Sequence, residues 1–480
     1  MCHEAASTLL RPATLSTVAT TAALRAPTTP SVVRRIPAWR RGAKPKRRAE
    51  LGLLVISSVI TVALYVVAEI GTKNKIPPHV GPILAVILVM ALAGHLANRW
   101  LAPNANSVIL PLAALLNGVG YVVIVRWTPP AAKLQATWAA LGILCYIATL
   151  FIIHHSRDLD RYRYLLLLAA VVLLVLPLVP HLGKTVTGAK LWVGFGRIEF
   201  QPVEIAKILL VIFFASYFAQ NKELLSIPTA RIRDRLVLDP RPLVPILLFW
   251  AFSMGVIALE DDIGFAMLIF TGFVVLLWVT TGRWAYIVFS LVLFGVGAFV
   301  AAHLFPQVQG RVDLWLHAAP NTQLGEGFYA LAHGGIAGSG LGTDPIAGNI
   351  YALTSDMIFV AIGDELGFIG AAAVVIAFVL LVGAGLRVAQ AARSDFSRLV
   401  AVGLTATIGF QAFFIMAGVL RILPFSGATL PFVAYGGSSL VANYILIAIL
   451  MRISDEGASS VTERAMGVSL PGETDFLVAP

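Results

Sequence analysis

The sequence predicts an all-α, polytopic helical membrane protein, and two observations lead to that prediction. Hydrophobic residues make up 58% of the 480 residues and charged residues only 12%, whereas soluble domains average about 45–50% and about 25%. Apolar runs of about 20 residues, the length of a helix that spans a bilayer, recur from residue 51 to residue 452. A soluble globular domain and a disordered chain are both excluded by this composition.

The apolar runs predict about 12 transmembrane helices. A membrane β-barrel would instead show short segments of alternating apolar and polar residues. The expected helices lie near residues 51–70, 81–97, 107–125, 134–153, 163–181, 204–219, 243–259, 264–281, 285–304, 357–386, 398–420 and 433–452.

The distribution of basic residues predicts that both chain termini are cytoplasmic. Five Lys and Arg residues fall between residues 220 and 242, on the expected inner side, whereas the longest outer loop, 305–356, contains only Arg311. Cytoplasmic loops are enriched in Lys and Arg. An even number of helices also returns the chain to the side on which it started.

The first 49 residues are expected to form a basic, disordered cytoplasmic tail. They carry ten of the 35 Lys and Arg residues and one acid, Glu4. Because the basic cluster directly precedes the first apolar run, we expect contact with anionic lipid headgroups and no binding of nucleic acid. The Ala-, Thr- and Arg-rich composition is also compatible with an organelle transit peptide.

The rest of the chain divides into three parts. Residues 50–160 hold the amino-terminal transmembrane helices, 161–454 a core with the outer loop 305–356, and 455–480 a short flexible cytoplasmic tail. Loops as long as 305–356 are usually functional or disordered. A further mixed polar and apolar segment, 182–207, is expected to lie in the outer interface before it enters a helix.

Ionisable residues in or beside membrane spans are costly, so they indicate candidate sites. Glu204 and Lys207 are three residues apart at the start of an expected helix and share one face. We expect them to line a cavity open to the outer side, and a structural ion pair is the alternative. Asp261 and Asp262 follow Glu260 in a short outer turn, which suits a cation or a substrate amine as well as a solvated turn.

Three acids lie at or near the start of the expected helix that follows the long loop. Asp356, Asp364 and Glu365 lie near its start, where acids stabilise the helix dipole without any further function. No His pair has the spacing of metal ligands on a helix, and Cys2 and Cys145 cannot form a zinc or iron–sulfur site. The Gly-rich run 334–342 follows no expected strand, so it is not interpreted as a nucleotide loop.

Residues 430–444, LPFVAYGGSSLVANY, resemble the Pro-Phe-x-Ser-Tyr-Gly-Gly-Ser-Ser signature of the SEDS (shape, elongation, division, sporulation) family of RodA/FtsW-type peptidoglycan glycosyltransferases. The resemblance covers roughly residues 160–452, and the two extra amino-terminal spans are similar to those of actinobacterial members. Four other runs resemble family segments in the same order: FQPVEIAK (200–207), LEDDIG (259–264), TSDMIFVAIGDELGFIG (354–370) and LPFSGATLPF (423–432).

The resemblance implies a function at the outer face of the bacterial cytoplasmic membrane. Family members polymerise lipid II, an undecaprenyl-linked disaccharide-pentapeptide, into glycan strands for cell elongation or division, together with a class B penicillin-binding protein. Two alternatives stay open: a non-catalytic scaffold or regulator of that partner, and a flippase for lipid-linked precursors. The concentration of polar residues on the outer side favours the glycosyltransferase and the scaffold over the flippase.

The resemblance also implies the site. Substrate-binding candidates are Glu204, Lys207, Arg311, Asp261, Asp262, Asp356 and the signature residues Tyr435, Gly436, Gly437 and Ser438.

The family's catalytic Asp precedes a Gly-x-Gly-aromatic run, but Asn321 or Thr322 stands near that place here. We therefore take Asp313, near Arg311 and Trp315, as the candidate general base and Glu326 as its alternative. A divalent cation, Mg²⁺ or Mn²⁺, or a basic side chain would stabilise the pyrophosphate leaving group.

Overall fold

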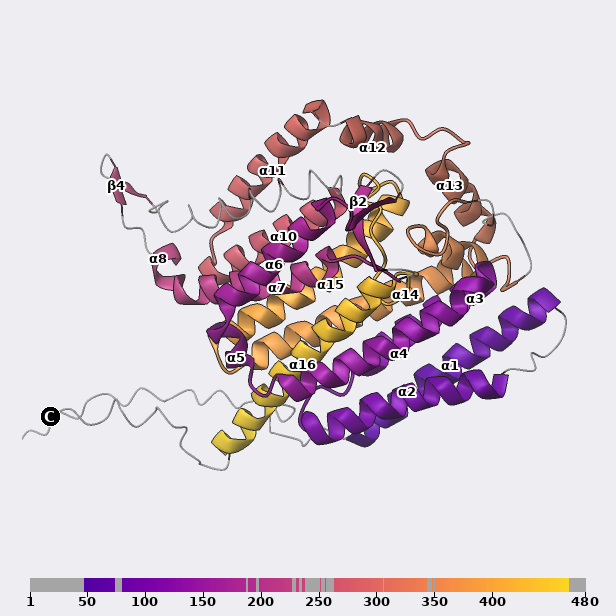
Figure 1. Cartoon of the computed structure of the whole chain (residues 1–480), viewed down its shortest axis with the longest axis horizontal. Helices are drawn as coiled ribbons and strands as arrows, with labels where there is room; N and C mark the ends of the chain where they lie inside the picture. Colours follow the sequence, from indigo (N-terminus) through magenta and orange to yellow (C-terminus); the bar gives the residue numbers. More distant parts are fainter. Residues whose placement is uncertain are drawn as a thin grey trace, which may run out of the picture. The chain divides into compact units, whose positions relative to one another are not determined.

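Figure 1 shows the computed structural model of the chain, which describes most of its residues. The described residues fall within one compact unit, Gly42–Pro480. They are 47–73, 80–186, 189–195, 198–226, 230–232, 235–237, 251, 255, 263–304, 306–342, 348 and 350–465.

Eleven of the expected transmembrane helices are present among these residues, which confirms the all-α polytopic fold. In the described part, nine helices are long and apolar enough to cross a membrane. They are α1 (Arg47–Lys73), α2 (Val80–Leu101), α3 (Ile109–Trp127), α4 (Pro129–Ile152), α7 (Val203–Gln220), α10 (Ile263–Thr281), α14 (Ile358–Ala391), α15 (Asp395–Val419) and α16 (Gly437–Ala465). Two shorter spans are α6 (Arg163–Val175) and α11 (Trp284–Leu304). The expected helix 243–259 lies outside the described residues.

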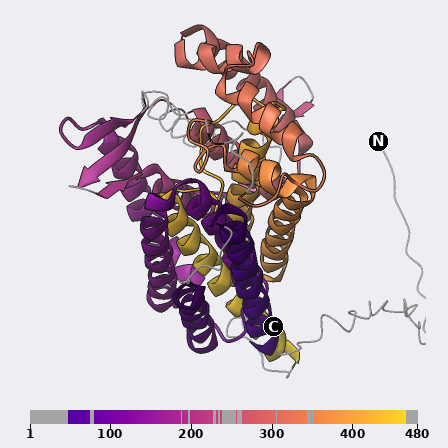
Figure 2. The same cartoon turned by 90° about the vertical axis from the view of Figure 1, so that its right-hand side faces the viewer.

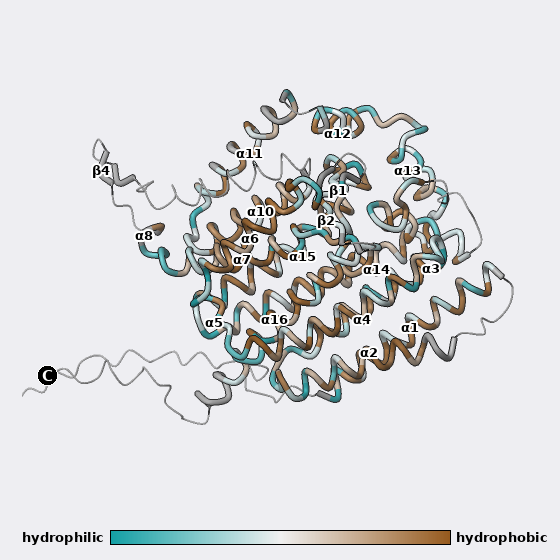
Figure 3. The backbone as a smooth tube through the Cα atoms, in the orientation of Figure 1, coloured by the Kyte–Doolittle hydropathy of each residue, from teal (hydrophilic) through white to brown (hydrophobic). Residues whose placement is uncertain are grey.

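Helix α16 is the most completely buried of these spans. Of the residues in its apolar 18-residue stretch, 89% are buried inside the protein, against 22% for α2, which lies at the periphery. Figure 3 shows apolar residues along the full length of the helices. Helices that are apolar on all sides suit a membrane, where the outward face contacts lipid and the inward face forms the core.

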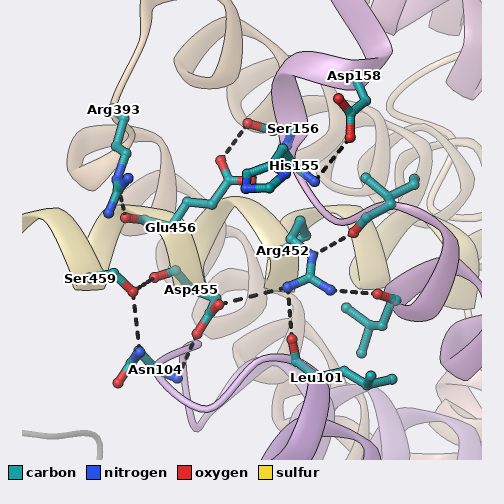
Figure 4. A network of polar contacts seen from close by, with 12 residues as sticks. Leu101, Asn104, His155, Ser156, Asp158, Arg393, Arg452, Asp455, Glu456 and Ser459 are labelled. Carbon is teal, nitrogen blue, oxygen red and sulfur yellow. Dashed lines mark hydrogen bonds and ion pairs between the residues drawn. The ribbon is translucent and has the colours of Figure 1, made fainter. Parts of the chain in front are cut away.

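One end of the bundle is joined by polar contacts to α16 (Figure 4). Arg452 donates hydrogen bonds to the carbonyl oxygens of Leu101 at 2.7 Å and Ile153 at 2.6 Å, at the carboxyl ends of α2 and α4. Asp455 accepts from the Asn104 backbone N–H at 2.6 Å. Helix α16 continues to Ala465, so the prediction of a flexible tail from residue 455 is wrong for its first part.

The start of α1 lies at this same end. The buried carboxylate of Glu50 lies 3.1 Å from Nδ1 of His95 and accepts a hydrogen bond from Asn98 at 3.1 Å, close to the end of α2. The first described helix therefore begins on the side of the bundle where the last one ends.

The opposite end carries the sheet and the short helices of the long loop (Figures 1 and 2). Residues 183–200, expected as an irregular interfacial segment, form an antiparallel sheet of β1 (Gly183–Val186), β2 (Ala189–Phe195) and β3 (Ile198–Phe200). The long loop contains α12 (Pro306–Leu316) and α13 (Gln323–Gly334). The remaining elements are α5 (Ser156–Arg161), a 3₁₀ turn at Leu176–Leu178, α8 (Lys222–Ser226), and the paired strands β4 (Ala230–Ile232) and β5 (Arg235–Val237).

Helix α14 is interrupted at Gly367, and the Gly-rich run packs against the interruption. Gly367 has a φ of 64°, a conformation that favours glycine. The freed carbonyl of Asp364 accepts from the Ser339 N–H at 2.9 Å, and that of Glu365 from the Gly340 N–H at 3.1 Å. The run 334–342 thus satisfies backbone groups that would otherwise be unpaired and buried.

Candidate active site

Three of the runs singled out in the sequence meet at the segment 420–436, between α15 and α16. The Tyr435 N–H donates to the Thr354 carbonyl at 2.8 Å. The Gln201 N–H donates to the Ser438 hydroxyl at 2.9 Å. The signature is thereby held against both the amino end of α7 and the segment before α14.

The two glycines of the signature, Gly436 and Gly437, are closely surrounded by neighbouring side chains. A Cβ on Gly437 would lie 2.2 Å from the indole ring of Trp138, and one on Gly436 would lie 3.2 Å from the Thr429 side chain. Tyr435 beside them is half-buried. Burial raises the pKa of its phenol above the ordinary value, and the Glu199 carboxylate raises that pKa further. Its hydroxyl therefore stays a hydrogen-bond donor at neutral pH.

Glu204 and Lys207 form a buried ion pair on one face of α7. Their side chains are 0% and 1% exposed, so they do not face lipid. Lys207 lines a small cavity of about 10 Å³, and an opening of this cavity to the outer side remains a prediction. The Lys207 ammonium also donates to Oε1 of Gln411 at 2.7 Å, and the Gln411 amide donates to the Thr429 carbonyl at 2.9 Å. This chain of contacts joins α7 and α15 to the 420–436 segment.

Arg311 and Asp356 both lie close to the exposed Gly427. Arg311 donates from Nη1 to the Ser426 carbonyl at 2.7 Å. A Cβ on Gly427 would lie 3.6 Å from Nη2 of Arg311 and 3.9 Å from Oδ2 of Asp356. Asp356 is not a helix cap, because the N-cap of α14 is Met357 and no side chain caps it. A guanidinium and a carboxylate therefore meet at the outer surface of the signature segment.

Asp313 lies on the other face of α12 from Arg311. Trp315, four residues after Arg311, donates from its indole to the Arg421 carbonyl at 3.1 Å, so this face packs on the 420–436 segment. Asp313 lies 3.0 Å from Nδ1 of His317, and both side chains are 74% exposed. Helical residues two apart do not face each other. The expected grouping of Asp313 with Arg311 and Trp315 is therefore wrong.

Thr322, near the place of the family's Asp, is the N-cap of α13. Its hydroxyl accepts from the Gly325 N–H at 3.2 Å. Glu326, expected to be the alternative base, lies four residues later on the same side of the helix. Its carboxylate is half-buried and has no hydrogen-bond or ion-pair partner within the part of the chain that the structure describes.

Two adjacent buried acids, Asp364 and Glu365, lie where α13, α14 and α3 meet. Asp364 is 2.8 Å from Nδ1 of His333, and Glu365 is 3.4 Å from Nε of Arg126. Both carboxylates are buried, beyond the first turn of α14. They are partners in tertiary contacts rather than dipole-stabilising acids, and neither partner was expected from the sequence.

The candidate cation site of the acidic turn, Asp261 and Asp262, lies outside the described residues. Among the residues that are described, no three His, Cys, Asp or Glu side chains gather closely enough to hold a metal ion.

Comparison with known proteins decides the family. A family model described as "Cell cycle protein" (FtsW, RodA, SpoVE) matches residues 128–459. The chain belongs to this family. A relative in the family, peptidoglycan glycosyltransferase RodA of Mycobacterium tuberculosis strain H37Rv, is 36% identical over 425 residues, which cover 85% of this chain and 90% of the relative. Such a relative agrees with the actinobacterial resemblance.

Solved structures of the family share the fold. The Rod shape determining protein RodA of Thermus thermophilus is 26% identical with a TM-score of 0.53, over 74% of this chain and 98% of that one. A chain solved in work on how a peptidoglycan synthase complex coordinates polymerization and crosslinking is 25% identical with a TM-score of 0.59, over the same shares.

Proposed function

We propose that the chain is a peptidoglycan glycosyltransferase that polymerises lipid II into glycan strands at the outer face of the cytoplasmic membrane. The observation that carries the proposal is the convergence of the family runs on the 420–436 segment and the start of α16, through Tyr435, Ser438 and Gln411. Relatives named RodA and the rod-shape protein of Thermus thermophilus support a role in cell elongation.

The reaction that this site would perform is a glycosyl transfer. The 4-hydroxyl oxygen of the acceptor sugar attacks the anomeric carbon of the donor, the bond to the pyrophosphate oxygen breaks, and undecaprenyl pyrophosphate leaves. A carboxylate takes the hydroxyl proton. Arg311 is the described cation best placed at the outer surface to stabilise the negative charge that develops on the leaving group.

We favour Glu326 over Asp313 as the base. Glu326 stands one helical turn from the place of the family's Asp, is half-buried, and lies in the first turn of α13. Asp313 is exposed, bound to His317, and directed away from the signature segment.

The partner and the orientation complete the proposal. The peptidoglycan synthase complex among the similar structures supports a partner that crosslinks the strands, a class B penicillin-binding protein. Helix α1 begins at the end of the bundle where α16 ends, and basic residues directly precede α1 in the sequence, so we place that end in the cytoplasm. A bound Mg²⁺ or Mn²⁺ would stabilise the pyrophosphate leaving group, and its presence remains a prediction.

Polymerisation of purified lipid II by the full chain, with and without its partner, tests the function. Glu326→Gln should lower the rate by about 10²–10⁴-fold, the contribution of a general base, while Asp313→Asn serves as the matched control on the same loop and should keep the rate. Wild-type protein that binds the partner but makes no polymer would identify a scaffold. Addition of EDTA followed by Mg²⁺ or Mn²⁺ tests the metal.

A further inference from the structure

An apolar cavity of about 520 Å³ lies among α1, α2, α3, α4 and α16. Of its 18 lining residues, 13 precede residue 128, where the family match begins. None of the residues assigned above to the active site lines it. The cavity is therefore built mainly by helices that the family match does not cover, and it is separate from the glycosyl-transfer site.

The cavity is elongated along the helices and closed at its inner end. Its lining on α3 extends from Leu110 to Tyr121, a rise of about 16 Å at about 1.5 Å per residue. Below it, Glu50 of α1 contacts His95 of α2 at 3.1 Å, and Tyr146 of α4 donates to the Asn98 side chain of α2 at 2.5 Å. These contacts hold α1, α2 and α4 together at one end and leave them apart above it.

The other end opens outward between α2 and α4. Val86 of α2 and Lys133 of α4 both line the cavity, and both are exposed, Val86 to 51%. Lys133 lies one turn after the start of α4, near the end of the bundle that carries the candidate active site. Within the described residues its ammonium forms no ion pair. The opening therefore combines an apolar channel with an exposed cation.

We propose that this cavity binds one chain of an anionic phospholipid of the outer leaflet, with the lipid phosphate at Lys133. An engineered apolar cavity of about 150 Å³ holds benzene, with its six carbons, so about 520 Å³ has room for roughly 20 carbons, one acyl chain. The cation at the opening favours a headgroup with a net negative charge over a zwitterionic one, in which an ammonium offsets the phosphate charge. A much longer undecaprenyl chain would exceed the cavity.

Lipid binding by the full-length chain in detergent tests the proposal without requiring enzymatic activity. The probes are dioleoyl-phosphatidylglycerol and dioleoyl-phosphatidylcholine, and native mass spectrometry measures how much of each is bound. Lys133→Gln should weaken phosphatidylglycerol binding by about fivefold, the effect of one basic residue near an anionic headgroup, and leave phosphatidylcholine unchanged. Ala136→Phe, which fills the cavity, should remove both lipids.

Ala140→Phe is the matched control, because Ala140 is on the same helix, is exposed, and does not line the cavity. Equal lipid binding by the Ala136→Phe and Ala140→Phe variants would overturn the proposal, as would phosphatidylglycerol binding that Lys133→Gln leaves unchanged. Retention of undecaprenyl phosphate in preference to phosphatidylglycerol would also overturn it. If Ala136→Phe does not fold, Lys133→Gln alone decides.

Discussion

Replacing Lys207 with Met should destabilise the protein far more than replacing the Glu204–Lys207 pair together. The single change leaves the Glu204 carboxylate fully buried without its cation, and Oε1 of Glu204 already has no hydrogen-bond partner among the described residues. Breaking a buried pair in this way costs about 3–5 kcal/mol. The double change Glu204→Leu with Lys207→Met removes both charges, and we expect it to be near neutral because neither charge then has to be desolvated.

The measurement is a double-mutant cycle of equilibrium unfolding in mixed micelles. The exposed pair of Lys184 and Glu199, 3.4 Å apart with side chains 44% and 47% exposed, is the control. Its coupling energy should be about 0–1 kcal/mol, as for other surface pairs. A Lys207→Met cost as small as that of the control would show that Glu204 is solvated, and the argument from burial would fail.

Three further predictions concern the signature and the long loop. Gly437→Ala should cost about 1–3 kcal/mol by overpacking against Trp138, while Gly383→Ala, with nothing within 4 Å of the new Cβ, should be neutral or stabilising in thermal unfolding. Thr322→Ala should cost about 1 kcal/mol by removing a helix cap, and Thr322→Asp should retain the stability because Asp caps equally well. Since the pKa of Tyr435 is raised above 10.0, stability linked to its protonated form is complete below about pH 10 and is lost only as the pH rises through the folded pKa. Tyr435→Phe should therefore leave the shape of the pH–stability curve between about pH 7 and 9 unchanged.

The helices could be predicted because the bilayer fixes the length of each apolar run. Apolar runs of that length predict α1 to α4 and α14 to α16 close to their observed positions. The β1–β3 sheet could not be predicted, since its strands are short and interrupted by glycines at 194 and 196. Short strands give too little alternation to distinguish them from an interfacial loop.

The candidate site was predicted where it depends on local spacing and missed where it depends on distant partners. The shared face of Glu204 and Lys207 follows from helical geometry, and the structure confirms it. Gln411, which lies 204 residues from Lys207, has no signal in the local sequence. Asp313 is close to Arg311 in the chain but not in space, because α12 directs the two side chains to different faces.

The Arg452 side chain links helices that are synthesised at very different times. It donates to carbonyl oxygens at the ends of two helices that are made much earlier, and 302 residues separate it from Leu150. At a translation rate of about 5–20 residues per second, those carbonyls wait roughly 15 to 60 s for their donor. Helices α2 and α4 thus enter the membrane with incompletely satisfied ends, and insertion of the last helix completes them. A nascent chain truncated before Arg452 would lack this donor. The hydrogen bonds at the ends of α2 and α4 are therefore completed only when synthesis reaches α16.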